Sequence, residues 1–233
     1  MRIAYWFIGI LVVAITGALF FSLARAATDN AHAPLAAFTL VAPKDVSESQ
    51  LVARALVPID APCPSIKAKG SQGKVTIPMT ERRPGATAAP AFATVLSCSA
   101  PLPTGLTEAD IAGLSIPATI PAQVDQIAIF ADSGCRVDDK RIQDCNNPDA
   151  WPLGRIASQI AAAKPDVILN PGDYYYREIP CPAEDAAKCS PGPAPTKGMP
   201  FDENDQGWLY EAIKPMTPMF SVAPIAFLRG NHE

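Results

Sequence analysis

Residues 166–173 read Asp-Val-Ile-Leu-Asn-Pro-Gly-Asp. The apolar run in this stretch is short and ends at a proline and a glycine, which is typical of a buried strand followed by a turn. Similar runs occur at 126–130 (Gln-Ile-Ala-Ile-Phe) and at 224–228 (Pro-Ile-Ala-Phe-Leu). We therefore predict strands over 126–130, 166–170 and 224–228, the first of them buried on both faces.

Helical patterns separate these strands. The helix predicted over 151–164 has apolar residues at i, i+4 and i+7 and a proline at each end: Ile156, Ile160, Ala163, Pro152 and Pro165. A second helix, predicted over 203–214, would bury Trp208, Leu209, Ala212 and Ile213. The alternation of strand and helix predicts an α/β domain with right-handed crossovers and a mainly parallel sheet.

The region before residue 121 has a different texture. Residues 27–48 are Ala-rich and polar without a clear period, and we interpret them as a linker. Residues 49–120 contain short apolar runs at 51–57, 74–77 and 92–96, interrupted by Pro, Gly and Ser. That pattern predicts a small β-rich domain that serves packing or binding, since no catalytic group of residues stands out in it.

The N-terminus has the features of an export signal. A basic start at Met1-Arg2 precedes an uncharged run over 3–23 and the sequence Ala24-Arg25-Ala26. This predicts a signal peptide over 1–26, with an uncleaved membrane anchor through residues 3–23 as the alternative. Either way we expect an exported protein that is periplasmic, secreted or anchored facing outside the cytoplasm.

Cysteine usage agrees with export. The chain has six cysteines, an even number that in an exported protein indicates disulfides. Of the fifteen ways to pair them, the shortest loops join Cys63 with Cys98, Cys135 with Cys145, and Cys181 with Cys189. A zinc site fits less well, because no two cysteines have C-x-x-C spacing and the chain has only two histidines.

Charge excludes one class of partner. The net charge is −4, and no polybasic segment occurs that could follow a nucleic-acid backbone. We therefore expect no binding of a nucleic-acid scaffold, although a nucleotide remains a candidate substrate.

Each of the three predicted strands is followed by residues that can bind metal. Asp132 follows the first strand, Asp173 the second, and Asn231 and His232 the third. Because the carboxyl ends of neighbouring parallel strands meet at one edge of a sheet, we expect these four side chains to converge there.

On these motifs the sequence resembles the calcineurin-like metallophosphoesterases, with purple acid phosphatase-like spacing, over residues 125–233. The resemblance implies an α+β sandwich-type domain with two metal ions of the Fe, Mn or Zn class. Asp132 would bind the first ion, Asp173 would bridge both, and Asn231 would bind the second. His232 would lie beside the phosphate.

The same resemblance implies an enzyme that hydrolyses a phosphate ester, as a phosphomonoesterase or a phosphodiesterase, acting on a small molecule or a nucleotide. Tyr176 stands where such proteins place a tyrosinate ligand for ferric iron, and Tyr174 or Tyr175 could take that place instead. Arg136, Arg177 and Arg229 each lie close to one of these motifs and could contact phosphate. Arg229, directly before Gly230, is the first candidate among them, and a surface ion pair is its alternative role.

The sequence also departs from the family pattern. Position 134 is Gly where many members carry a histidine ligand, and Ala131 stands where Gly is usual. The later histidine motifs have no counterpart within the 233 residues. We therefore expect 121–233 to be the N-terminal half of a truncated domain, inactive alone, with an open sheet edge and an uncovered apolar face. The alternative is a non-catalytic exported fragment or binding module.

Overall fold

The computed structural model describes residues 33–82, 94–189 and 204–232. The chain divides into two units, Met1–Ala33 and Pro34–Glu233, and only Ala33 of the first is described. The predicted signal peptide or anchor therefore lies outside the described residues. In the part of the chain that is described, no helix has both the length and the hydropathy to span a membrane.

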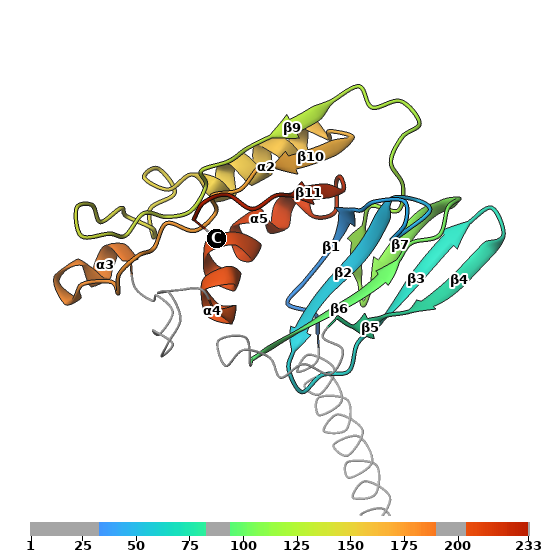
Figure 1. Ribbon diagram of the computed structural model, residues 1–233, viewed down its shortest axis with the longest axis horizontal. Helices are drawn as coiled ribbons and strands as arrows, with labels where there is room; N and C mark the ends of the chain where they lie inside the picture. Colours follow the sequence, from blue (N-terminus) through green and yellow to red (C-terminus); the bar gives the residue numbers. More distant parts are fainter. Residues whose placement is uncertain (1–32, 83–93, 190–203, 233) are drawn as a thin grey trace, which may run out of the picture. The chain divides into compact units, whose positions relative to one another are not determined.

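Two β-sheets and a few helices make up the unit that begins at Pro34 (Figure 1). The larger sheet has seven strands in the order β5-β6-β2-β1-β11-β10-β9, and the smaller has four in the order β4-β3-β7-β8. The strands of the larger sheet are β1 Ala36–Val41, β2 Leu51–Pro58, β5 Thr80–Glu81, β6 Val95–Pro101, β9 Ile127–Ile129, β10 Val167–Asn170 and β11 Ile225–Phe227. Those of the smaller sheet are β3 Ser65–Gly70, β4 Gly73–Pro78, β7 Leu106–Ile111 and β8 Leu114–Ile116.

Three neighbouring parallel strands form one end of the larger sheet. β10 pairs in parallel with β9, with Ile168 opposite Ala128, and also with β11, with Ile168 opposite Ile225. Helix α2, Leu153–Ala163, lies between β9 and β10 in the chain. The prediction is confirmed for the three strands, their parallel arrangement and the first helix. It succeeded because apolar periodicity and flanking prolines are local signals.

The second predicted helix is present but is not a regular α-helix. Residues 205–219 form a continuous helical segment made of α4 Asp205–Gly207, the π-helix η3 Trp208–Ile213, α5 Lys214–Met216 and the short 3-10 helix η4 Thr217–Met219. Ala212 and Ile213 are buried as predicted, whereas Trp208 and Leu209 are only half-buried. Before it, η2 Ala183–Asp185 and α3 Ala186–Cys189 form a short helical turn.

The prediction that residues 27–48 form a linker is wrong for 36–41. These residues are β1, which lies inside the larger sheet, antiparallel to β2 and parallel to β11. Its alanines misled the prediction, because alanine has a low strand propensity. In the fold, Ala36 and Ala37 are 3% and 5% exposed, and their small side chains let both faces of the strand be covered.

The predicted boundary at residue 120 does not separate two structural units. β2, β5 and β6 from the β-rich region and β9, β10 and β11 from the α/β region belong to the same sheet. The link is β1, because it pairs with β2 on one side and β11 on the other. This junction joins segments far apart in the chain and leaves no local signal in the sequence.

β9 is also less buried than predicted. Ile127 and Ile129 are 55% and 65% exposed, because β9 is the edge strand and only one of its faces packs against described residues. On that same exposed side Val167 and Leu169 of β10 are only half-buried. Within the described ranges this end of the sheet therefore has the open edge and uncovered apolar face expected from the sequence.

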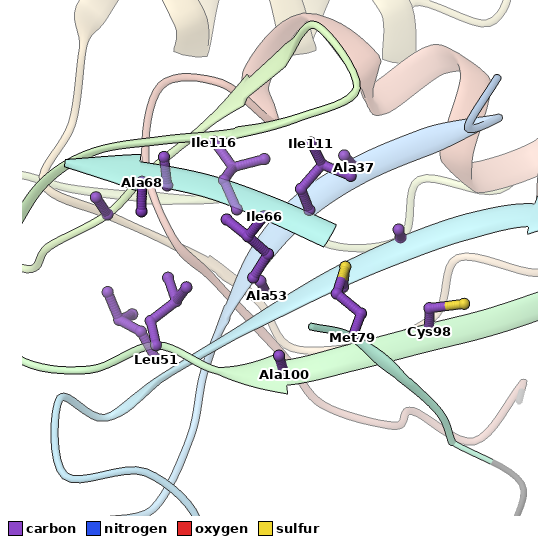
Figure 2. Packing of buried hydrophobic residues seen from close by; sticks show 14 of the residues in the cluster. Ala37, Leu51, Ala53, Ile66, Ala68, Met79, Cys98, Ala100, Ile111 and Ile116 are labelled. Carbon is purple, nitrogen blue, oxygen red and sulfur yellow. The ribbon is translucent and has the colours of Figure 1, made fainter. Parts of the chain in front are cut away.

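One hydrophobic core lies between the two sheets (Figure 2). Figure 2 shows Ile66 and Ala68 of the smaller sheet together with Leu51 and Ala53 of β2. In β3 the burial alternates, with Ile66 and Ala68 inside and Lys67 exposed, as the two-residue period of a strand requires. We call this side of the larger sheet, which carries Ala53, the sandwich side.

A second core covers the opposite side of the larger sheet, here called the helix side. It includes residues from β1, β9 to β11, α2 and the 205–219 segment: Phe38, Phe130, Leu153, Ala157, Ile168, Ala212, Met216, Met219, Phe220 and Ile225. Parallel strands need a covering layer of helices, and α2 and 205–219 supply it here. This core holds the three strand ends that carry the predicted motifs.

All three predicted disulfides are present. They join Cys63 to Cys98, Cys135 to Cys145, and Cys181 to Cys189, and no described cysteine is free. Disulfides persist in oxidising compartments, so the three bridges fit an extracellular environment.

Removing the longest of these bridges is expected to cost the most stability. The Cys63–Cys98 bridge spans 35 residues and Cys181–Cys189 spans 8. From loop-closure entropy we expect Cys63→Ser/Cys98→Ser to lower the free energy of unfolding by about 4 kcal/mol and Cys181→Ser/Cys189→Ser by about 2.5 kcal/mol. Urea denaturation of the oxidised proteins measures both. A larger loss from the short-loop pair would contradict the ranking.

Candidate metal centre at the strand ends

The three motifs converge at the carboxyl ends of β9, β10 and β11. The backbone N–H of Ser133 donates to the carbonyl of Asp173 at 2.9 Å, which ties the first motif to the second. The backbone N–H groups of Asn231 and His232 donate to Oδ1 of Asp173 at 2.9 and 3.4 Å, which ties the third motif to the second. Asp173 is therefore the central residue of the group.

Tyr176 joins the two carboxylates. Its hydroxyl oxygen lies 2.5 Å from Oδ1 of Asp132 and 3.1 Å from Oδ2 of Asp173, and it donates its proton toward them. Burial, and then the hydrogen bonds to Asp132 and Asp173, raise the pKa of the Tyr176 phenol well above its ordinary value. Tyr174 and Tyr175 pack against Trp208, whereas the Tyr176 hydroxyl contacts both carboxylates.

Both aspartates have strained backbones. The backbone φ is 51° at Asp132 and 59° at Asp173. Both values lie in the left-handed region, which residues other than Gly, Asn and Asp rarely adopt. Each costs on the order of 1 kcal/mol or more, and such residues cluster at functional sites. The strain here falls on the two carboxylates that face the same hydroxyl.

Glycines allow the motifs to approach one another closely. A Cβ on Gly172, whose φ is +110°, would lie 2.2 Å from the backbone nitrogen of Gly230. A Cβ on Gly134 would lie 2.8 Å from the carbonyl oxygen of Tyr174. The loop after β9 therefore packs against the loop after β10 with no room for a side chain at 134. This gives a physical reason why no histidine occupies that position in this chain.

Cationic side chains line one side of the group. The guanidinium of Arg136 lies 4.8 Å from the centre of the Tyr176 ring and 3.8 Å from Oδ2 of Asp138. Arg136 and Arg141 both line a cavity of about 290 Å³ whose wall includes Asp132 and Tyr176. Arg141 was not among the predicted residues, because it is nine positions after Asp132 in a loop without regular structure and no sequence period points to it.

The remaining predicted residues lie at the edge of the group. The His232 ring is 4.3 Å from the Tyr176 ring, and its Nδ1 is 3.9 Å from a carboxylate oxygen of Glu178. Asn231 is exposed and contributes its backbone N–H to Asp173. Arg229, the predicted phosphate contact, is exposed on the loop after β11. Arg136 is the arginine for which the structure shows a contact with Tyr176.

Ser133 was not singled out in the sequence, although it lies between two motif residues. Its hydroxyl is buried and has no hydrogen-bond partner within residues 33–82, 94–189 and 204–232. A buried hydroxyl without a partner is rare and costs free energy, so it marks a place where a ligand could bind.

The donors that converge here are oxygens. The Tyr176 phenol lies within hydrogen-bond reach of two carboxylates, and oxygen donors of this kind suit a hard or intermediate cation. Among the described residues, however, no group of three or more His, Cys, Asp or Glu side chains is placed to bind a metal ion. Within the described residues these oxygen donors are therefore too few for a complete metal site.

Comparisons with known proteins add two solved structures. One is a purple acid phosphatase isolated from yellow lupin (Lupinus luteus) seeds, with a TM-score of 0.44 and 17% identity over 87% of this chain. The other is PhoD, with a TM-score of 0.40 and 14% identity over 85% of this chain. This chain covers 36% and 39% of the lengths of those two chains. No family model and no curated protein matches, and similarity at this level assigns the chain to no family.

Proposed function

We propose that this protein contributes the first half of a dinuclear metal site that hydrolyses phosphate esters outside the cytoplasm. The observation that carries the proposal is the contact of one hydroxyl, that of Tyr176, with the carboxylates of both Asp132 and Asp173 at the end of adjacent parallel strands. Ordinary turn chemistry does not require two strained aspartates to share a buried phenol.

In this proposal Asp132, Asp173, Tyr176 and Asn231 hold metal ions of the Fe, Mn or Zn class, with Asp173 as the bridge. When bound, such ions polarise the phosphoryl oxygens and supply a hydroxide near neutral pH.

The other side chains of the site have electrostatic roles in this proposal. Arg136 and Arg141 line the cavity beside Asp132 and would contact a phosphate group there. His232, next to Tyr176, is placed to donate a proton or a hydrogen bond to a phosphoryl oxygen, and Glu178 lies near its Nδ1. Arg229 stays a candidate second contact with phosphate. The substrate class is a small phosphate mono- or diester, nucleotides included.

The test replaces the central carboxylate with its isosteric amide. Asp173→Asn in the full chain should lower metal-dependent hydrolysis of p-nitrophenyl phosphate or bis(p-nitrophenyl) phosphate by about 10²–10³-fold, the scale for loss of a group that stabilises transition-state charge. The amide can still accept the hydrogen bonds from Asn231 and His232, so the fold should persist.

Asp166→Asn is the matched control. Asp166 lies just before β10, at the opposite end from Asp173, and accepts hydrogen bonds from the backbone N–H groups of Asp125 and Gln126. The Asp166→Asn substitution should leave hydrolysis unchanged. Equal activity of the Asp173 variant and the wild type, or no metal-dependent hydrolysis by the wild type, would reject the proposal. The second result would favour the alternative, an exported binding module without catalysis.

A further inference from the structure

A second and larger cavity lies on the helix side of the larger sheet, and its lining includes Tyr174, the residue after Asp173. Its volume is about 600 Å³, within the range of about 300–1,000 Å³ typical of small-molecule sites. Its floor is formed by β1, β2, β6 and β11 and its wall by the π-helix η3, and its apolar lining includes Phe38, Leu56, Trp208, Leu209 and Phe227. Short π-helices are rare and occur frequently at functional sites.

A charged residue, Arg54, lies inside this apolar cavity. It is in the middle of β2 opposite Phe38 of β1, so both side chains are on the helix side of the sheet. Arg54 is only 9% exposed. Its one side-chain hydrogen bond within the described residues is a 3.3 Å contact with the Ser97 hydroxyl, and no described carboxylate forms an ion pair with it.

A second arginine makes the environment more electropositive. Arg82 also lines the cavity, and its backbone N–H donates to the carbonyl of Ser97. Burial, and secondly the nearby charge of Arg82, lower the pKa of Arg54 to about 10, so it remains charged at neutral pH. Arg54 is buried and Arg82 is exposed. A buried guanidinium without an anion is costly, so Arg54, with Arg82 beside it, marks a place where an anion would bind.

The one carboxylate among the described lining residues does not neutralise the pair. Oδ2 of Asp205 accepts hydrogen bonds from the backbone N–H and hydroxyl of Thr94, at 2.6 and 2.8 Å, and from the backbone N–H of Val95 at 3.0 Å. Its role in the described structure is to fix the start of β6. The cavity thus combines apolar walls with an excess of positive charge.

We infer that this cavity binds an amphiphilic carboxylate, such as a medium-chain fatty acid, with the carboxylate on Arg54 and Arg82 and the alkyl chain against Phe38, Leu56 and the η3 wall. A carboxylate matches a guanidinium in bidentate geometry, and Ser97 can supply a further hydrogen bond to it. An apolar chain suits the lining because it displaces water without leaving polar groups unpaired. The inference does not depend on phosphate ester hydrolysis.

The test uses dodecanoate as the probe, with dodecanol and acetate as probes that lack the charge or the chain. Isothermal titration calorimetry on the full chain should show dodecanoate binding at least about tenfold tighter than either. Arg54→Met keeps the apolar bulk and removes the charge, and it should weaken dodecanoate by at least about tenfold while leaving dodecanol unchanged. Lys69→Met removes an exposed charge on the smaller sheet and should change neither.

Three binding results would overturn the inference. They are no dodecanoate binding by the wild type, equal affinity for dodecanoate and dodecanol, and equal dodecanoate affinity of wild type and Arg54→Met. Urea denaturation in the absence of ligand provides a separate check. If Arg54 is a ligand-binding residue, Arg54→Met is at least as stable as the wild type, because a buried unpaired charge is lost. A clear loss of stability would assign Arg54 a structural role and reject the site.

Discussion

Arg177→Met should lower the free energy of unfolding by about 3–5 kcal/mol, the scale for breaking a buried ion pair from one side. Arg177 and Glu211 approach to 2.7 Å, with side-chain exposures of 3% and 2%. Glu211 also accepts the backbone N–H of Cys135, and Arg177 donates to the carbonyl of Cys189. The pair therefore links the η3 helix to the disulfide-bonded loops that follow β9 and β10.

Urea denaturation at fixed pH measures this effect, with Arg155→Met as the matched control. Arg155 pairs with Asp149 on the surface, where its side chain is 55% exposed, so its loss should cost under about 1 kcal/mol. The double variant Arg177→Met/Glu211→Leu should recover much of the loss, because no uncompensated charge remains. Equal costs for the two single arginine variants would contradict the prediction.

The cost of Arg177→Met should depend on pH. Burial raises the pKa of the Glu211 carboxyl, and Arg177 acts in the opposite direction, so removing Arg177 raises that pKa further. A carboxyl with a higher pKa in the folded state binds a proton that the unfolded chain releases, so the fold gains stability at low pH and loses it as pH rises through the folded pKa. The variant should therefore be less impaired at about pH 5 than at about pH 8.

Gly172→Ala should lower the free energy of unfolding by about 2–5 kcal/mol and impair the strand-end site. Left-handed backbone strain contributes about 1–2 kcal/mol, and forcing a methyl group against backbone contributes about 1–3 kcal/mol. The new Cβ would lie 2.2 Å from the nitrogen of Gly230, and backbone cannot move aside as a side chain can. The shift would separate Asp173 from the N–H groups of Asn231 and His232.

Gly113→Ala isolates the two contributions. Gly113 has φ +91° but nothing within 4 Å of an added Cβ, so only the strain of about 1–2 kcal/mol should appear. Urea denaturation of both variants gives the difference between their free energies of unfolding. Hydrolysis of the phosphate ester should fall for Gly172→Ala alone. A Gly172 cost no greater than the Gly113 cost would show that the two strand-end loops are not tightly packed against each other.

Local patterns account for the parts of the fold that were predicted correctly. The strand at 166–170, the helix at 151–164 and the disulfides between neighbouring cysteines depend on residues close together in the chain. The convergence of Asp132, Asp173 and the backbone of Asn231 also followed, because adjacent parallel strands place their ends together. The catalytic and metal-binding roles of these residues remain predictions.

The errors have the opposite origin. β1 was missed because its alanines carry no strand signal of their own, and its place between β2 and β11 depends on partners distant in sequence. The burial of β9 was overestimated because an apolar run does not show whether its strand is central or at an edge. No sequence pattern distinguishes Arg54 from other arginines, because its apolar surroundings are residues of the cavity that are distant in sequence.

Side-chain periodicity and turn residues act over a few positions, so they were enough to predict the three parallel strands and the residues at their ends. The contacts of Tyr176 with Asp132 and Asp173, and the cavity that Arg54 and Arg82 share with Trp208, are visible only in the folded chain. The physical reason is that the energies of buried charges and hydrogen bonds depend on groups brought together by long-range packing, which periodicity does not encode.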